Sequence, residues 1–231
     1  MKQKLIKYFK ENRTSAFTRF ICCVYSFFSF NKFKIQRGNE FVYTGNFLNG
    51  VKIVVKGIGN KIIINPYGLS LLKNTTIYIS GNNNIVKIGD RCNLINAEIW
   101  IEDSWGGVEI GTKTNILGRT HLACIEGSKI IIGDDCLFST DVVFRTGDSH
   151  SILDNKTQKR INPSQDIIIG SHCWFGNKVT VLKGVTLGND SIIATGSILT
   201  KTCNQSNVIL AGSPAKIVKE DITWNINRIT I

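Results

Sequence analysis

One histidine lies in the least regular stretch of this sequence. Residues 144–166, FRTGDSHSILDNKTQKRINPSQD, are polar, interrupt an apolar pattern that runs on both sides of them, and contain His150 and Asp148. An imidazole accepts and releases protons near neutral pH, so a histidine in such a place is a candidate for acid–base chemistry. A lone histidine in a loop is more often only solvated. Function is favoured where a rigid scaffold holds the loop in position.

A six-residue repeat supplies such a scaffold. From residue 169 onward, the first position of every hexad is a large apolar residue and the fifth is small or compact. The first positions are Ile169, Phe175, Val181, Leu187, Ile193 and Leu199, and the fifth positions are Cys173, Val179, Val185, Ser191 and Ser197. This period fits neither a helix nor one continuous strand. It predicts a triangular coil of short strands and turns, in which stacked coils bury a continuous apolar column.

The repeat extends toward the N-terminus with a longer period. Ile-Gly sequences recur at Ile88, Ile110 and Ile132, 22 residues apart, which is three hexads plus an excess in a turn. Residues 41–86 have β-branched runs and turn sequences typical of less regular coils. We therefore predict an all-β fold, a parallel β-helix over residues 41–212 with an extruded loop at 145–166. An N-terminal segment, 1–40, and a C-terminal helix or tail, 213–231, should cap its ends.

The positive charge is concentrated near the N-terminus. Lys and Arg number 28 against 17 Asp and Glu, a net charge of +11, and residues 1–37 alone hold nine basic residues against Glu11. The rest of the chain is close to neutral, so the composition does not indicate a nucleic-acid partner. An amphipathic helix is predicted in this basic segment, packed on the protein or a sister subunit, or lying on a membrane surface. Its apolar stripe consists of Phe17, Phe20, Ile21, Val24 and Phe28.

Cysteine use and hydropathy favour a cytoplasmic protein. The seven cysteines include no C-x-x-C pair, which indicates reduced thiols and no zinc motif. The apolar run after Arg19 is shorter than the about 20 residues that span a bilayer, and no small-residue cleavage site follows it. We expect no bound metal.

Several motifs together resemble the left-handed β-helix acetyltransferases that use acetyl-CoA. They are the hexads, the loop with its histidine, CWFGNKVTVLKGVTLG at 173–188, ATGSILTK at 194–201 and AGSPAKIVKE at 211–220. The order of the D-x-H loop, the RIN and IIIG-x-H-x-W-x-G stretch and a final tryptophan is similar to that of bacterial capsular polysaccharide O-acetyltransferases, including those of polysialic acid. The resemblance is close over 140–224 and general over 85–140, and it implies a left-handed sense of coiling.

The resemblance implies a role for the histidine. His150 lies 24 residues before Trp174, the separation found in the family, and so corresponds to the base that takes the proton of the acceptor hydroxyl. Asp148 could orient or charge-balance its ring, as could a carboxylate of another coil, such as Glu126 or Asp141. Of the other histidines, His172 is expected to be structural. His121, one layer below the interruption, is a weaker candidate for contact with the acceptor.

The resemblance also implies acetyl-CoA as the acyl donor. Asn177 occupies a position where the family often has a serine near the thioester, so its amide or its backbone N–H could stabilise a developing oxyanion. Lysines near the end of the chain could pair with the cofactor phosphates. The residues at cofactor-binding positions are Trp174, Asn177, Thr195, Thr200, Lys201, Lys216 and Lys219.

We therefore predict an acetyl-CoA-dependent O-acetyltransferase acting on a sugar hydroxyl of a bacterial surface polysaccharide or its precursor. The family implies a homotrimer with active sites between subunits, and residues 1–37 could contact the inner face of the cell membrane. An amino-sugar N-acetyltransferase would need only an amine as acceptor. A γ-carbonic-anhydrase-like metalloenzyme would need three histidines around zinc, and a non-catalytic β-helix scaffold would not bind acetyl-CoA.

Overall fold

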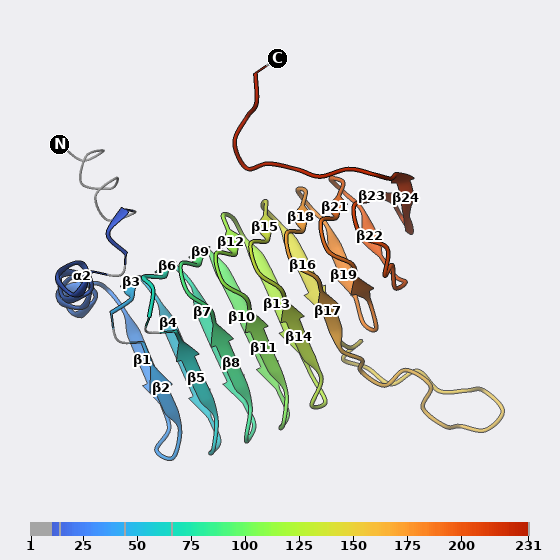
Figure 1. The fold of residues 1–231 in the computed structure, drawn as a ribbon. Helices are drawn as coiled ribbons and strands as arrows, with labels where there is room; N and C mark the ends of the chain where they lie inside the picture. Colours follow the sequence, from blue (N-terminus) through green and yellow to red (C-terminus); the bar gives the residue numbers. More distant parts are fainter. Residues whose placement is uncertain (1–10, 14, 44, 66, 231) are drawn as a thin grey trace.

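Three parallel sheets form the walls of a triangular β-solenoid in the computed structural model, which describes residues 11–13, 15–43, 45–65 and 67–230 (Figure 1). Each coil adds one strand to each wall in turn.

Sheet A contains β1 (Lys32–Ile35), β4 (Lys52–Lys56), β7 (Thr76–Ser80), β10 (Ala97–Glu102), β13 (Thr120–Cys124), β16 (Val142–Arg145), β19 (Thr180–Leu182) and β22 (Ile198–Leu199). Sheet B contains β2 (Glu40–Val42), β5 (Lys61–Ile64), β8 (Ile85–Ile88), β11 (Gly107–Ile110), β14 (Lys129–Ile132), β17 (Ile167–Ile169) and β20 (Thr186–Leu187). Sheet C contains β3 (Phe47–Asn49), β6 (Leu71–Lys73), β9 (Asn93–Ile95), β12 (Asn115–Ile116), β15 (Leu137–Phe138), β18 (Trp174–Phe175), β21 (Ile192–Ile193), β23 (Ile209–Gly212) and the antiparallel β24 (Ala215–Lys219).

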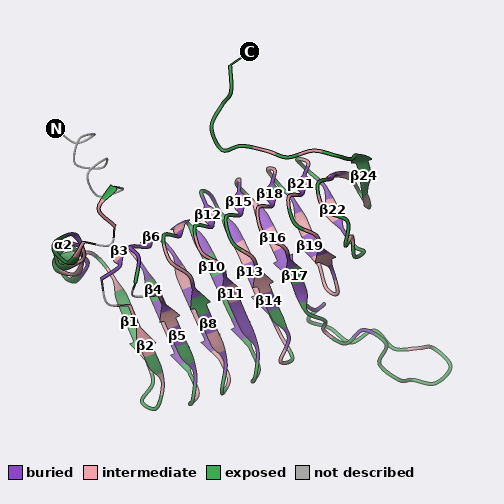
Figure 2. Ribbon diagram, viewed as in Figure 1, coloured by how far each residue is buried: buried purple, intermediate pink, exposed green. Residues whose placement is uncertain are grey.

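The predicted parallel β-helix is confirmed down to its register. Ile88, Ile110 and Ile132 are consecutive neighbours in sheet B, and Ile132 then pairs with Ile169 and Ile169 with Leu187. The first and fifth positions of the hexads are all buried. Strand residues therefore alternate between a buried and an outer side (Figure 2). The left-handed sense of coiling remains a prediction.

Three phenylalanines fill the core of the solenoid next to the extruded loop. Phe138, Phe144 and Phe175 are completely buried. The rings of Phe138 and Phe175 stack with centroids 4.6 Å apart and an interplanar angle of 10°. These rings lie in the coils directly below and beside the extruded loop, so they support the part of the solenoid that holds the predicted site.

An asparagine ladder, which the sequence analysis did not anticipate, stabilises the corner between sheets A and B. The Asn60 side-chain amide donates to Asn39 Oδ1 at 2.9 Å, and the amide of Asn84 donates to Asn60 Oδ1 at 3.0 Å. Gly106 N then donates to Asn84 Oδ1 at 2.7 Å. Buried backbone groups at the turns thereby gain partners, and successive coils are held in register.

The predicted N-terminal helix forms, but its aromatic stripe does not face the protein. Helix α2 (Ala16–Phe28) covers the first coil beside β3 through Thr18, Cys22 and Ser26, all buried. Ser26 Oγ accepts a hydrogen bond from Leu48 N at 2.9 Å. Most of the predicted stripe is exposed instead. Residues 1–10 of the predicted segment lie outside the described residues.

The first coil begins before the predicted start of the solenoid, and of the helix or tail expected after residue 212 the structure shows a strand and a tail. The first coil begins with β1, which pairs with β4 from Lys32 onward, so the predicted boundary after residue 40 falls inside that coil. At the other end, β24 and an irregular tail follow β23, and no helix forms among described residues 213–230. The tail turns back along the solenoid (Figure 1), where Ile222 N donates to Asn207 O at 3.0 Å.

Phe138→Ala should lower the free energy of unfolding by about 3–5 kcal/mol, because it removes a buried ring and leaves a cavity that the neighbouring coils cannot fill. Urea unfolding followed by circular dichroism measures the change. Leu117→Ala is the control, since Leu117 is 52% exposed and its loss should change stability by at most about 0.5 kcal/mol. Equal stability of the two variants would contradict the assignment of the Phe138 ring to the core.

Candidate functional site

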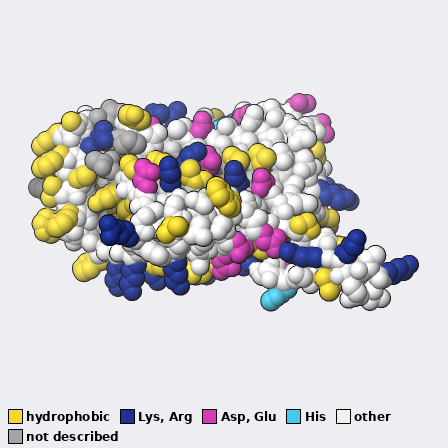
Figure 3. All heavy atoms as spheres, turned by 90° about the horizontal axis from the view of Figure 1, so that it is seen from below, with side chains coloured by type: hydrophobic (Ala, Val, Ile, Leu, Met, Phe, Trp, Pro, Cys, Tyr) yellow, Lys and Arg dark blue, Asp and Glu magenta, His cyan; other side chains and the backbone are white. Residues whose placement is uncertain are grey.

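The interruption in the sequence is a loop that leaves the solenoid at the corner between sheets A and B. Residues 146–166 connect β16 to β17 and project from the body of the molecule (Figure 1). Leu153 and Arg160 form an antiparallel bridge within the loop, and Lys and Arg side chains extend along it (Figure 3). His150 is exposed, and in the part of the chain that the structure describes its ring makes no hydrogen bond.

Asn162, which is buried, holds the histidine segment in place. Its amide nitrogen donates to the His150 carbonyl and to Asp148 Oδ2, both at 2.8 Å. Its amide oxygen accepts from Ile152 N at 2.7 Å and from Arg160 Nε at 3.2 Å. One side chain therefore uses both its donor and acceptor groups to join the two arms of the loop beside His150.

Two ion pairs attach the loop to the solenoid. Lys183, on the coil above, pairs with Asp148 Oδ2, and the hydrogen bonds from Lys183 and Asn162 lower the pKa of that carboxyl. On the coil below, Glu126 Oε1 lies 2.6 Å from Arg160 Nη1. The hydrogen bonds from Arg160 and the Ser164 backbone lower the pKa of Glu126. The loop is thus fixed on both sides at its base.

The carboxylates considered as partners of His150 have other roles within the described chain. The Asp148 side chain faces Lys183 and Asn162, while its carbonyl accepts from His150 N at 2.8 Å. Glu126 is paired with Arg160, and Asp141 lies 2.6 Å from Arg119 Nη2. Asp148 therefore positions the loop rather than the imidazole in a single chain.

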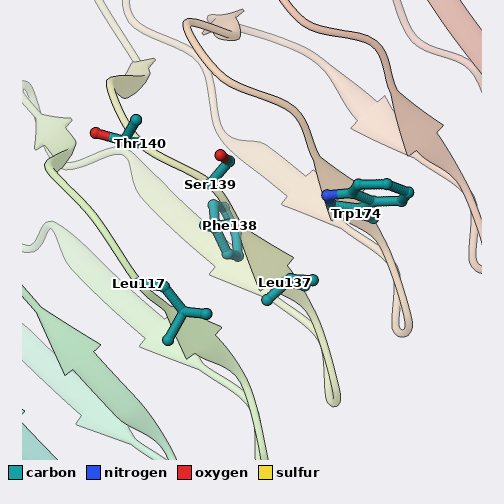
Figure 4. A pocket seen from close by; sticks show the side chains of 6 residues that line it. All are labelled: Leu117, Leu137, Phe138, Ser139, Thr140 and Trp174. Atoms are coloured by element: carbon teal, nitrogen blue, oxygen red, sulfur yellow. The ribbon is translucent and has the colours of Figure 1, made fainter. Parts of the chain in front are cut away.

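Trp174 lies on a different wall, beside a shallow hollow on the outer side of sheet C. The hollow has a volume of about 330 Å³ and is lined by Leu117, Leu137, Phe138, Ser139, Thr140 and Trp174 (Figure 4). Trp174 is 39% exposed and is the register neighbour of Leu137. The hollow offers an apolar surface with two hydroxyls at its edge.

The C-terminal tail flanks the other side of this tryptophan. Trp224 stacks on the His172 ring with centroids 4.3 Å apart, and its Nε1 donates to the His172 carbonyl at 2.7 Å. His172 Nδ1 lies 2.8 Å from Asp190 Oδ1, and the Trp174 and Trp224 ring centroids are 6.0 Å apart. The expectation that His172 is structural agrees with these contacts.

The remaining predicted residues lie at several corners of the prism. Asn177 and Thr195 occupy stacked turns between sheets C and A, where Lys178 N donates to Thr140 O and Gly196 N to Asn177 O. Thr200 and Lys201 follow β22 at the corner from which the loop leaves two coils below. Lys216 and Lys219 lie exposed on β24. A single chain therefore does not gather the predicted residues around His150.

Three buried polar atoms near these elements have no partner among the described residues. One is Asn177 Oδ1, at the turn beside the hollow's Thr140, and the other two are Thr120 Oγ1 and His121 Nε2 on β13. Burial, with a further contribution from Arg145, lowers the pKa of His121. The free acceptor of Asn177 suits a bound molecule that presents an N–H group.

The sequence patterns did not indicate Asn162, Lys183 and Trp224 as parts of the site. Asn162 and Trp224 belong to motifs, RIN and the final tryptophan, that predict no role for either side chain. Their roles arise from contacts across 12, 35 and 52 residues, namely Asn162 with His150, Lys183 with Asp148 and Trp224 with His172. Hexad spacing does not encode such contacts.

Known proteins share both the sequence pattern and the fold. The family described as "Bacterial transferase hexapeptide (six repeats)" matches residues 166–201. A polysialic acid O-acetyltransferase of Neisseria meningitidis is 34% identical over 190 residues, covering 73% of this chain and 87% of that protein. One of Escherichia coli O1:K1 / APEC is 38% identical over 117 residues, covering 51% of this chain but only 38% of the relative.

Two crystal structures superpose on most of the chain. The polysialic acid O-acetyltransferase OatWY gives a TM-score of 0.79 at 31% identity, covering 86% of this chain and 92% of that one. The polySia-specific acetyltransferase NeuO gives 0.74 at 35% identity, covering 82% and 86%.

Asn162→Asp should lower kcat by about 10- to 100-fold, the effect expected when a catalytic group is displaced by about 1 Å. The carboxylate cannot donate to the His150 carbonyl and repels Asp148, although it keeps the acceptor for Ile152 N. Steady-state acetyl-transfer assays measure kcat. Asn155→Ala, at the tip of the same loop, should leave kcat unchanged. A wild-type kcat for Asn162→Asp would show that the hydrogen bonds of Asn162 do not position His150.

Proposed function

The chain belongs to the hexapeptide-repeat O-acetyltransferases, and from this premise we propose that it transfers an acetyl group from acetyl-CoA to a hydroxyl of an acidic bacterial surface polysaccharide. The observation that supports this proposal most is that the loop carrying His150 is held in a fixed position. An otherwise regular solenoid is interrupted at one corner, and Asn162 together with two ion pairs fixes the interruption so that His150 projects outward.

His150 acts as the general base. Its imidazole takes the proton from the sugar hydroxyl as the oxygen bonds to the carbonyl carbon of the acetyl thioester, and it gives that proton to the CoA sulfur when the C–S bond breaks. The Asn162 bond to the His150 carbonyl fixes the backbone from which the ring extends. Pre-positioning matters here because reacting groups gain most when they meet already aligned.

Acetyl-CoA would supply the acetyl group as an activated thioester. The residues fit such a donor: Asn177 has a free buried acceptor, and Lys216 and Lys219 form no ion pair among the described residues. Asn177 and Thr195 would hold the amide-containing arm beside Trp174. Thr200, Lys201, Lys216 and Lys219, at the C-terminal end of the solenoid, would bind the polar and phosphate groups.

We infer that the complete site forms between subunits of a homotrimer. Strands β9, β12, β15, β18, β21 and β23 of sheet C contain no charged residue, and Leu137, Trp174, Ile192 and Ile209 form one outward row. Charge depletion is typical of the core of a subunit interface. A neighbour packed along this wall would bring its own loop and His150 toward Trp174 and the hollow.

His150→Ala should remove acetyl transfer and leave acetyl-CoA binding and oligomeric mass unchanged, since the ring makes no hydrogen bond within the described chain. Transfer from labelled acetyl-CoA to a panel of surface polysaccharides measures the first, with mass spectrometry to locate the ester. Calorimetry and analytical ultracentrifugation measure the others. Turnover at the wild-type rate in His150→Ala would eliminate the proposed mechanism.

Helix α2 supports a second part of the proposal, contact with the cytoplasmic face of the membrane. No helix among the described residues is long and apolar enough to cross a bilayer. Phe27 and Phe28 are 83% and 78% exposed, and exposed basic residues, Lys32, Lys34 and Arg37, follow the helix. Hydrophobic side chains at the end of the molecule that holds α2 are visible in Figure 3. An aromatic face beside basic residues suits an anionic lipid surface.

Phe27→Ser combined with Phe28→Ser should strongly reduce co-sedimentation with vesicles of phosphatidylglycerol and phosphatidylethanolamine. Activity on a soluble acceptor should not change, because these rings point away from the solenoid. Ile226→Ser, which removes an exposed apolar side chain of the C-terminal tail, is the control and should not affect vesicle binding. Vesicle binding by the double variant at the wild-type level would exclude α2 as the lipid contact.

A further inference from the structure

An aromatic pair lies on the outer side of sheet A, away from the residues assigned above. The rings of Tyr78 and Trp100 stack with centroids 4.1 Å apart and an interplanar angle of 22°. Trp100 is 36% exposed, and its Nε1 donates to Glu102 Oε1 at 2.9 Å. Lys56 Nζ lies 5.5 Å from the Tyr78 ring centroid. Because the rings stack between adjacent strands, they face each other along the solenoid axis and project from the wall as one aromatic ridge, which with its charged neighbours we call the platform.

The platform leads directly to the catalytic loop. Tyr78, Trp100, Ala123 and Arg145 are consecutive register neighbours along sheet A, and Arg145 is the last strand residue before the loop. With strands about 4.8 Å apart, Trp100 lies roughly 10 Å from Arg145 along the solenoid axis. Because the Ala123 side chain is small, the surface between Trp100 and Arg145 is recessed. We call these four residues the sheet A row.

The surroundings of the sheet A row do not resemble a subunit interface. Exposed charged residues flank it. Glu98 and Glu102 lie on β10 with Trp100, and Lys52 and Lys56 lie on β4, which pairs with the strand of Tyr78. Lys and Glu are depleted in interface cores because burying them without partners is costly. The outward apolar row of sheet C, by contrast, lies on strands that contain no charged residue. Sheet A therefore favours a polar, charged occupant over a sister subunit.

We propose that the sheet A row binds the part of an acidic polysaccharide acceptor that extends beyond the sugar being acetylated. One face of a sugar ring is covered by C–H groups, which pack on an aromatic ring because its face is electron-rich. Glu98 and Glu102 can accept hydrogen bonds from sugar hydroxyls. Lys52 and Lys56 near Tyr78, and Arg145 at the loop end of the sheet A row, can pair with carboxylates of the polysaccharide.

This inference rests on the proposed function and makes it more specific. A polymer lying along the solenoid axis would contact the platform while one of its sugars meets His150 at the loop. A dimer would occupy only the loop end. The sheet A row should therefore select for acceptor length, and it should add affinity without taking part in the chemical step.

Trp100→Ala tests the proposal with two acceptors, a sialic acid dimer and a long sialic acid polymer. Calorimetry measures binding of the polymer, and initial rates give kcat/KM for both acceptors. We expect polymer affinity and polymer kcat/KM to fall roughly tenfold, the size of one lost stacking contact. The kcat/KM for the dimer should not change. Trp100→Phe should restore most of the loss, because the ring is kept.

Tyr67→Ala is the matched control, since Tyr67 is an exposed aromatic residue between sheets B and C, and it should behave as wild type. Polymer binding by Trp100→Ala at the wild-type level, or an equal loss for dimer and polymer, would overturn the proposal. A change in oligomeric mass would do so too, because it would make this wall a subunit contact. A wild-type protein that binds the polymer but acetylates neither acceptor would defeat the proposed function and leave the binding row intact.

Discussion

Backbone pairing between successive coils is the constraint on which the rest of this molecule depends. Every strand in the middle of the solenoid hydrogen-bonds to the coil above and the coil below, so all coils must keep one register. The inward aliphatic residues enforce it, because each contributes about 1.5–3 kcal/mol when buried and a slip of one residue would turn it outward. Residues in excess of one coil must therefore form a loop at a corner between two sheets.

The loop with His150 is a consequence of that constraint. The equivalent positions of β16 and β19, Val143 and Thr180, are separated by the extra residues of the loop and yet remain register neighbours. The solenoid is unchanged by the insertion, while the loop acquires its own anchors in Asn162, Lys183 and Glu126. The rigid solenoid thus positions the His150 imidazole, although its regular coils have no position for this residue.

The outer side chains are free of the register requirement, and sheets A and C use this freedom differently. Sheet C keeps an uncharged row around Trp174, which suits a sister subunit and the acyl donor. Sheet A has the Tyr78–Trp100 pair between basic and acidic side chains, which suits a glycan. The N-terminal end of the solenoid is closed by α2, whose small and polar residues face inward and whose aromatic residues are exposed.

The sequence by itself determined the repeating coil, the buried first and fifth hexad positions and the place of the loop, because each follows from periodicity within a few neighbouring residues. The motifs also identified the acetyltransferase family. Only the tertiary structure decided that Asp148 faces Lys183, that α2 turns its phenylalanines outward, and that the Tyr78 and Trp100 rings, one coil apart, stack on each other. Coil lengths and turns set these long-range contacts, and they become visible only when the coils are stacked.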